Sequence, residues 1–286
     1  MPGSQVKNIT SVRFILDLLM VLCYMCTMKI LVCVKQVIDT ESPLVVDQDA
    51  AWVRDDGKVA RRMNRYDEYA LEEAVRIREE FPDTVIDVIT MGPEGAGAVA
   101  LKGLEKGADH AVHLRTGSGG YLPPGFIASE MAKVAGDRDY QLVITGFMSE
   151  DCMHAQVGPL LASMLGIPSA VAVVQQTVDT GGGSIEVACE LEGGARELVG
   201  LELPALVTVQ TGINTPRYPK LSDVLRAQDQ EIEVMDVDDG SVKAAMEGCP
   251  YRLLYPPEGA RGVVMEGTAE EKADRLIEIL HEHSVL

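Results

Sequence analysis

The segment from Gly146 to Gly158 holds the residues best suited to bind an anion. Its sequence, GFMSEDCMHAQVG, follows an apolar stretch, and a glycine there lets the chain turn sharply. Polar residues then lead into an expected helix, whose free N–H groups and positive dipole end suit a phosphate. Ser149 and Gln156 can donate hydrogen bonds to such a phosphate, and Gly158 lets the backbone come close to it. In the competing interpretation Ser149 or Asp151 only caps the helix, because the spacing matches neither a Walker loop nor GxGxxG.

Other reactive residue types lack partners at useful spacing. His110 and His113 flank a short apolar stretch without a Cys or carboxylate at ligand distance, so we expect no metal ion. No Ser-His-Asp or Cys-His order stands out, and we expect no catalytic residue. Acidic pairs at 72–73 and 79–80 share an expected helix with two arginines, which predicts a solvated charged face.

The surrounding pattern alternates apolar strands with amphipathic helices. The expected strands are Ile30–Val37, Val85–Met91, Ala111–Leu114, Gln141–Thr145 and Ala205–Gln210. The expected helices are Tyr66–Glu80, Gly95–Lys106, Phe126–Val134 and His154–Leu165. Continuous apolar strands, each followed by a helix, predict an α/β fold with a parallel sheet covered on both faces. Alternating runs at Ser184–Glu190 and Glu197–Glu202 predict an added antiparallel hairpin.

Ligands of such a sheet bind beyond the carboxyl ends of its strands, near the switch in strand order. The segments after Val37, Met91 and Thr145 are therefore the candidate positions for a site. The segment after Thr145 is the richest of the three in polar residues.

The chain divides into three parts by pattern. Residues 1–27 form an apolar extension interrupted by Asp17, and we expect the folded protein to begin near Met28 after an upstream start codon, with an export signal as the alternative. Residues 28–235 hold the expected strands of the sheet and its helices, and we expect them to form one domain that carries the candidate site. Residues 236–286 are acidic with weak periodicity apart from an expected helix at Thr268–His283, which predicts an arm that packs on another chain.

Composition narrows the partners and the compartment. The 286 residues carry a net charge of −19, which argues against nucleic acid and against an anionic membrane surface. The six cysteines are scattered through a chain too long to need disulfides, so we expect a reducing, cytoplasmic environment. Cys23 and Cys26 form a lone CxxC, for which we expect no metal or redox role.

Several separated motifs together resemble the electron-transfer flavoprotein beta subunits. They are MKILVCVKQVID at Met28–Asp39, NRYDEYALEEA at Asn64–Ala74, MGP at Met91–Pro93, the loop Gly146–Gly158, and PRYPKL at Pro216–Leu221. They occur in the order expected for that family, from Met28 to the C-terminus.

The resemblance implies a Rossmann-like domain of the adenine nucleotide alpha hydrolase type, paired with an alpha subunit that holds the redox-active FAD. It implies an electron carrier without its own catalytic residues, working between acyl-CoA or other dehydrogenases and a quinone oxidoreductase or similar acceptor. The beta subunit would hold AMP, or a second FAD as in electron-bifurcating members. Its site by motif comprises Cys33, Asn64, Arg65, Tyr66, Asp67, Met91, Gly146, Ser149, Asp151, Ala155, Gln156, Val157 and Gly158.

Two departures from the family pattern bear on the ligand. Arg65 stands where the family usually has proline, and its charge could touch the nucleotide phosphates. The loop around His154 is closer to the bifurcating type, so AMP and a second FAD both stay open. A stand-alone nucleotide-binding stress protein is the alternative function, although such proteins lack a long C-terminal arm.

The resemblance also implies a recognition loop at Pro216–Arg226. Leu221 would be the apolar anchor offered to a partner dehydrogenase. The alternative is an ordinary amphipathic helix with Leu221, Val224 and Leu225 in the chain's own core.

Overall fold

The computed structural model describes residues 28–42, 44–47, 52–54, 59–117, 120–179, 183–248, 262 and 264–285. These residues fall into two compact units, divided after Tyr251. The predictions for the extension 1–27, including Cys23 and Cys26, lie outside the described residues.

The first unit is built on one sheet with the strand order β11–β10–β9–β12–β8–β1–β6–β7–β13. Its strands are β1 (Lys29–Cys33), β6 (Val85–Gly92), β7 (His110–Arg115), β8 (Leu142–Gly146), β9 (Ser169–Asp179), β10 (Ser184–Glu190), β11 (Arg196–Glu202), β12 (Ala205–Val209) and β13 (Ile232–Asp236). In this order, each neighbouring pair from β9 through β12, β8, β1, β6 and β7 to β13 is parallel. Strands β10 and β11 form the expected antiparallel hairpin, and β10 also pairs antiparallel with β9. Two small antiparallel pairs, β2 (Gln36–Ile38) with β5 (Arg61–Met63) and β3 (Val46–Asp47) with β4 (Trp52–Val53), stand apart.

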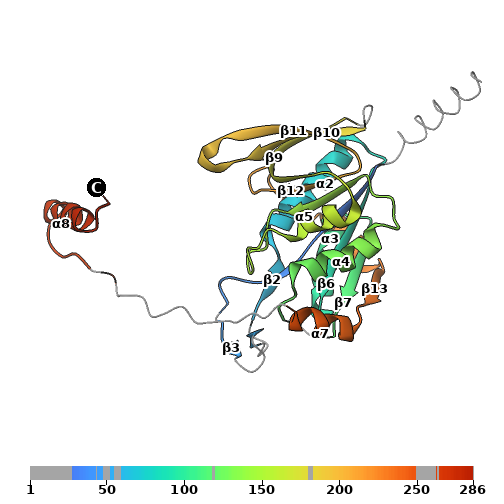
Figure 1. Ribbon diagram of the computed structural model, residues 1–286, viewed down its shortest axis with the longest axis horizontal. Helices are drawn as coiled ribbons and strands as arrows, with labels where there is room; N and C mark the ends of the chain where they lie inside the picture. Colours follow the sequence, from blue (N-terminus) through green and yellow to red (C-terminus); the bar gives the residue numbers. More distant parts are fainter. Residues whose placement is uncertain are drawn as a thin grey trace, which may run out of the picture. The chain divides into compact units, whose positions relative to one another are not determined.

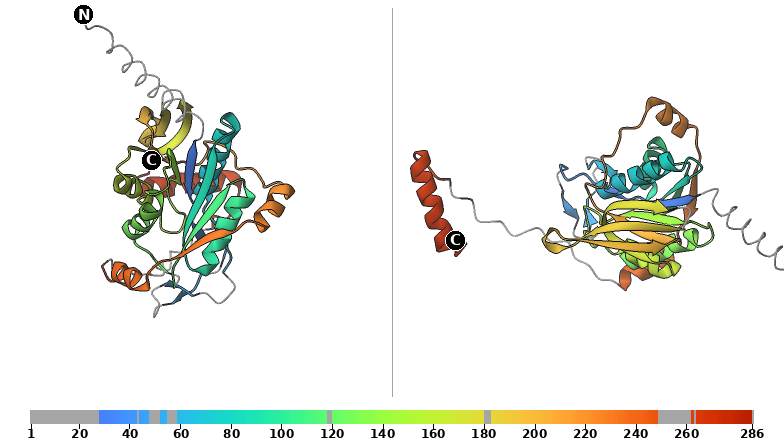
Figure 2. Two further views of the ribbon diagram at one scale, coloured as in Figure 1. Left: turned by 90° about the vertical axis from the view of Figure 1, so that its right-hand side faces the viewer. Right: turned by 90° about the horizontal axis from the view of Figure 1, so that it is seen from above.

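Helices cover both faces of this sheet (Figures 1 and 2). The helices of the first unit are α2 (Arg65–Glu80), α3 (Gly97–Glu105), α4 (Pro124–Ala135), α5 (Val157–Leu165), α6 (Leu221–Gln228) and α7 (Asp239–Glu247), with 3-10 turns at Glu94–Ala96 and Glu192–Gly194. Successive residues of a strand point to opposite faces, so Ile30 joins the core under α2 and α3 while Leu31 joins the core under α4 and α5. Burial on both faces explains the continuous apolar runs, and the predicted α/β class is confirmed.

The expected first strand is in fact two strands. β1 ends at Cys33, and β2 begins at Gln36 and pairs with β5 instead of the main sheet. The break falls where the Lys35 N–H donates to the Asp67 carboxylate, 2.7 Å away, instead of to a strand neighbour. A side-chain acceptor on another element thus ends the strand, which hydrophobicity alone cannot predict.

β9, β13 and α7 are among the elements that the sequence analysis did not predict. β9 lies between β12 and the hairpin. β13 is an edge strand that pairs with β7. Ion pairs of Arg138 with Glu233 and of Arg115 with Asp236 join it to the rest of the first unit. α7 follows, with Asp238 accepting a hydrogen bond from Ser241 N as its cap. β13, which includes residue 235, and α7, which follows it, therefore both belong to the first unit.

The second unit holds α8 (Ala269–Glu282), close to the expected helix. A capping box of Thr268 and Glu271 begins it, and no residue of α8 is buried. Leu276 and Ile277 are about half exposed. The apolar residues Leu253, Leu254 and Val263 of the expected arm lie outside the part of the chain that the structure describes.

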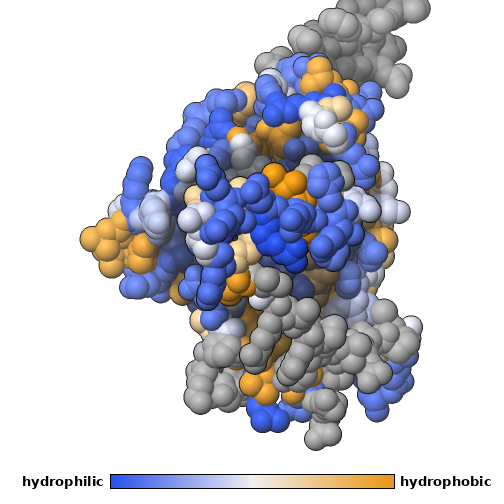
Figure 3. All heavy atoms as spheres, turned by 90° about the vertical axis from the view of Figure 1, so that its left-hand side faces the viewer, coloured by the Kyte–Doolittle hydropathy of each residue, from blue (hydrophilic) through white to orange (hydrophobic). Residues whose placement is uncertain are grey.

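Hydrophilic side chains predominate on the face drawn in Figure 3, around smaller groups of hydrophobic ones. This distribution agrees with the surplus of acidic residues. The exposed apolar side chains of the first unit include Leu198 on β11, and Tyr218 and Leu221 at the start of α6.

A glycine lets α3 lie close against β6. A Cβ added at Gly103 would stand 2.9 Å from Val88 Cγ2, so Gly103→Ala should lower the free energy of unfolding by about 1–3 kcal/mol. Gly125→Ala in α4 is the control, because nothing lies within 4 Å of its added Cβ. That variant should gain up to about 1 kcal/mol from helix propensity. Urea unfolding of both variants measures the difference, and equal stabilities would show that α3 shifts to admit the methyl group.

Candidate functional site

A cavity of about 560 Å³ lies at the carboxyl ends of the central strands. Cys33 ends β1, Met91 is near the end of β6, and Gly146 ends β8, and all three line the cavity. The chain runs from β1 to β6 and β7 on one side, while β8 lies on the other side of β1. The cavity is therefore at the switch in strand order, where open parallel sheets bind ligands.

Most of the residues expected from the sequence meet at this cavity. Those that line it are Cys33, Asn64, Asp67, Met91, Gly146, Ser149, Asp151, Ala155, Gln156, Val157 and Gly158. Arg65 and Tyr66 are not among the lining residues: the Arg65 N–H donates to Glu150, and the Tyr66 ring lies 6.3 Å from that of Phe147. Leu221 is on α6, away from the cavity lining.

A buried carboxylate joins the elements beneath the cavity. Asp67 Oδ2 accepts from Lys35 N at 2.7 Å, and Oδ1 accepts from Asn64 Nδ2 at 3.0 Å. The Asn64 amide also donates to Met148 O and accepts from Glu150 N, at 2.9 and 3.1 Å. The start of α2 is thus tied both to the end of β1 and to the loop after β8.

The same burial sets the protonation of this region. Burial raises the pKa of Asp67 to about 7, although its hydrogen bonds with Asn64, Lys35 N and Gly146 act in the opposite direction. Burial, together with the charge of Asp67, also raises the pKa of the Cys33 thiol. Cys33 is therefore a neutral, unreactive thiol at the edge of the cavity.

Lys35 provides a cation that the sequence analysis missed. Its Nζ lies 2.6 Å from Asp151 Oδ1 and 3.3 Å from Ser149 Oγ. Burial raises the pKa of Asp151, but the charge and hydrogen bond of Lys35, together with hydrogen bonds from Ser149 and Cys152 N, hold that pKa below its ordinary value. The available signal was a lysine directly after the first apolar strand of a strongly acidic chain.

The helix after this loop begins without a side-chain cap. Gln156 is the N-cap residue of α5, and its side chain makes no capping hydrogen bond. Ser149 and Asp151 face Lys35 instead, so the interpretation of either as the helix cap is wrong. The helix begins at Val157 and not at His154, because Met153 and Ala155 have φ of 53° and 52°, outside the right-handed helical region. An uncapped helix start beside a lysine suits an anion.

Two glycines let the elements around the cavity approach one another. A Cβ at Gly158 would lie 2.6 Å from Thr208 Cγ2 and 2.8 Å from Thr145 Oγ1. A Cβ at Gly146 would lie 2.7 Å from Tyr66 Cβ. Gly158 therefore packs the start of α5 against the sheet while also lining the cavity, and the ligand approach expected of it stays a prediction.

Comparison with known proteins identifies the family of this α/β chain. Residues 51–240 match the model of the electron transfer flavoprotein domain. The chain is 33% identical over 265 residues to the electron transfer flavoprotein subunit beta of Methylophilus methylotrophus, covering 89% of this chain and 98% of that protein. The subunits beta of Bos taurus and Bacillus subtilis are 32% and 30% identical, covering 89% and 88% of this chain and 99% and 97% of theirs. The chain belongs to the electron transfer flavoprotein beta-subunit family.

The assignment confirms the resemblance carried by the separated motifs and makes this an electron-transport flavoprotein by family. The coverage extends over nearly the whole length of these relatives. Within the described part of the chain, no helix has the length and apolar character needed to cross a membrane.

The protonation of Asp67 predicts a pH effect. Its pKa of about 7 exceeds the ordinary 3.8, so between these values the folded state binds more protons than the unfolded state, and stability falls as pH rises. In Asp67→Asn this fall in stability is absent, because the asparagine side chain does not titrate. The destabilisation caused by the variant should therefore be largest near about pH 5 and shrink toward about pH 8.

Melting temperatures of this electron transfer flavoprotein subunit, at one protein concentration across that pH range, test the effect. Asp151→Asn is the control, because the pKa of Asp151 is lowered and its difference from wild type should stay constant over the range. A destabilisation by Asp67→Asn that grows with pH would mean that the three donors outweigh burial.

Proposed function

We propose that this chain is the beta subunit of a heterodimeric electron transfer flavoprotein that binds an adenine nucleotide in its cavity. The nucleotide is AMP or the AMP portion of a second FAD. The redox-active FAD is shared with an alpha subunit, and electrons pass from acyl-CoA or other dehydrogenases to a quinone oxidoreductase or similar acceptor. The observation that supports nucleotide binding best is the uncapped start of α5 beside Lys35, at the switch in strand order.

The cavity offers both surfaces that a nucleotide requires. Gln156, Val157 and Gly158 line it at the positive end of α5, where a phosphate is stabilised by free N–H groups and by the helix dipole. Ile127 and Met131 from α4 supply apolar lining suited to a base or a sugar face. The phosphate would lie toward α5 and Lys35.

Lys35 and Asp151 balance one another when no anion is near. A phosphate brought to this loop would compete with the Asp151 carboxylate for the Lys35 ammonium, 2.6 Å away. Ser149 Oγ, which accepts from Lys35, can donate its own proton to the phosphate. Lys35 and the loop together therefore offer a cation and two neutral donors, Ser149 and Gln156, to a dianionic group.

Variants of this loop test nucleotide binding. Gln156→Ala and Ser149→Ala should each weaken binding by about 1.5–3 kcal/mol, because each removes a donor to a charged acceptor. Lys35→Met should also lower the adenine content of the purified complex. Lys102→Met is the control, since Lys102 pairs with Glu105 on α3 and does not line the cavity.

Flavin and adenine measured together in the wild-type complex decide between AMP and a second FAD. One FAD with one AMP indicates the first, and two FAD indicate the second. Full occupancy and unchanged affinity in all three loop variants would leave the loop without a role in binding.

Exposed apolar side chains support a docking role for α6. Leu221 is 74% exposed at the first turn of the helix, and Tyr218 just before it is 94% exposed. Only Ala227 of α6 is buried, so Leu221 and Leu225 are not core residues of this chain. A few exposed apolar residues often carry most of the energy of a transient interface.

Leu221→Ala is expected to slow electron transfer from the dehydrogenase while flavin spectrum and nucleotide content stay normal. An exposed leucine contributes little to folding, so the melting temperature should hardly change, whereas truncating a core leucine costs about 2–5 kcal/mol. Leu198→Ala, an exposed leucine on β11, is the control for loss of apolar surface. Unchanged transfer by Leu221→Ala would remove the docking role.

The C-terminal arm, 236–286 by sequence, supports assembly with the alpha subunit. α8 buries none of its residues, yet Leu276 and Ile277 carry apolar surface that a partner chain would cover. Domain 28–235 holds the cavity. The cytoplasmic location stays a prediction from cysteine usage.

A further inference from the structure

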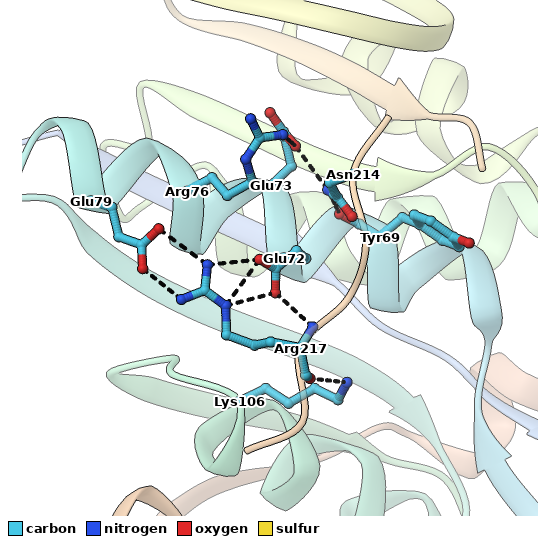
Figure 4. A network of polar contacts seen from close by, with 8 residues as sticks. All are labelled: Tyr69, Glu72, Glu73, Arg76, Glu79, Lys106, Asn214 and Arg217. Atoms are coloured by element: carbon cyan, nitrogen blue, oxygen red, sulfur yellow. Dashed lines mark hydrogen bonds and ion pairs between the residues drawn. The ribbon is translucent and has the colours of Figure 1, made fainter. Parts of the chain in front are cut away.

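The segment that leads into α6 is fastened to α2 by side chains on both. Figure 4 shows Asn214 and Arg217 facing acidic residues of the helix. Asn214 Nδ2 donates to Tyr69 O at 2.9 Å and to Glu73 Oε2 at 2.8 Å. Glu72 and Glu73 are only 7% and 3% exposed, so the expectation of a solvated face at 72–73 is wrong. The partners lie far along the chain and cover these carboxylates.

Arg217 forms the stronger of the two attachments. Its Nε and Nη2 donate to Glu72 Oε1 at 3.0 and 2.8 Å, and its backbone N–H donates to Glu72 Oε2 at 3.1 Å. The far side of the guanidinium donates through Nη1 and Nη2 to the two oxygens of Glu79. Lys106 Nζ donates to Arg217 O at 3.3 Å, so the backbone is held on two sides.

The exposed side chains follow directly after this attachment. Tyr218 and Leu221 are one and four residues beyond Arg217 and are largely exposed, whereas the Glu72 side chain is only 7% exposed. A segment that is already held in place, with only its contacting side chains exposed, loses less conformational entropy on binding than a free loop does.

We propose that Arg217 is a positioning residue that holds the segment 214–221 on α2, so that Tyr218 and Leu221 are presented to the dehydrogenase. This inference rests on the docking role of Leu221 in the proposed function. Arg217 acts through the backbone that it fixes and does not itself contact the dehydrogenase.

The geometry requires an arginine. A planar guanidinium can face two carboxylates with separate N–H pairs, whereas a lysine ammonium is a point charge that cannot reproduce the fork. The hydrogen bonds of Arg217 lower the pKa of Glu79, and those with Glu79 and Glu72 raise the pKa of Arg217. Arg217 and Glu79 are therefore both charged at neutral pH.

Arg217→Lys tests the proposal in the complex with the alpha subunit. The lysine keeps a charge beside buried Glu72 but releases the fork. With the dehydrogenase as variable substrate, its KM should rise by about three- to tenfold while kcat at saturation stays near wild type, because only ordering of the segment is lost. Arg78 is also on α2, and its guanidinium pairs with Asp109 outside that helix. Arg78→Lys is therefore the matched control and should leave KM unchanged.

A double variant separates positioning from direct contact. If Arg217 acts through Leu221, Arg217→Lys combined with Leu221→Ala should raise KM little more than Leu221→Ala alone. Independent, multiplied effects would overturn the proposal. Glu79→Gln weakens the exposed ion pair of Arg217 and should also raise KM. This variant replaces Arg217→Lys as the test if Arg217→Lys lowers the melting temperature.

The outcomes also distinguish this inference from the proposed function. If Leu221→Ala raises KM while Arg217→Lys and Glu79→Gln do not, docking stands and the positioning role falls. If Leu221→Ala has no effect, the docking role itself fails and the positioning role fails with it. A fall in melting temperature without a change in KM would leave Arg217 as a structural ion pair only.

Discussion

The buried carboxylate of Asp67 is the interaction on which the site depends. It accepts hydrogen bonds from Lys35 N at the end of β1 and from Asn64 at the start of α2. Asn64 in turn holds the loop after β8 through Met148 and Glu150. Three elements from separate parts of the chain therefore meet at one side chain. Moving any of them would leave a buried polar group without a partner, which is costly.

Helix α2 connects the cavity with the segment 214–221, for which a docking role is proposed. Its first turn carries Asp67 at the cavity, and its middle carries Glu72 and Glu73, which hold Arg217 and Asn214 (Figure 4). The helix also packs on the central strands of the sheet. The cavity and the segment 214–221 thus share one helix, although each forms its own set of contacts.

The few cations of this acidic chain are placed at defined points. Lys35 faces Asp151 in the loop after β8, and Arg217 lies between two glutamates of α2. Arg138 and Arg115 join the edge strand β13 to the unit. Exposed ion pairs add little stability, but a partly buried pair fixes position, because separating it would leave one charge unpaired.

The sequence by itself determined the α/β class, the central strands, the added hairpin, α2 and the loop from Gly146 to Gly158. Each of these features can be predicted from local hydrophobic periodicity or from turn residues. The family followed from motifs spread along the chain, and eleven of the thirteen residues expected at the cavity line it.

Only the tertiary structure decided the break after β1, the place of β13, the role of Lys35 and the burial of Glu72 and Glu73. These features depend on partners distant in sequence: Lys35 and Asp151 are 116 positions apart, and Arg217 and Glu72 are 145 apart. Local periodicity reports which face of an element is apolar, but it does not report which charged residue will cover a given carboxylate. That is settled only when the chain folds and brings opposite charges together.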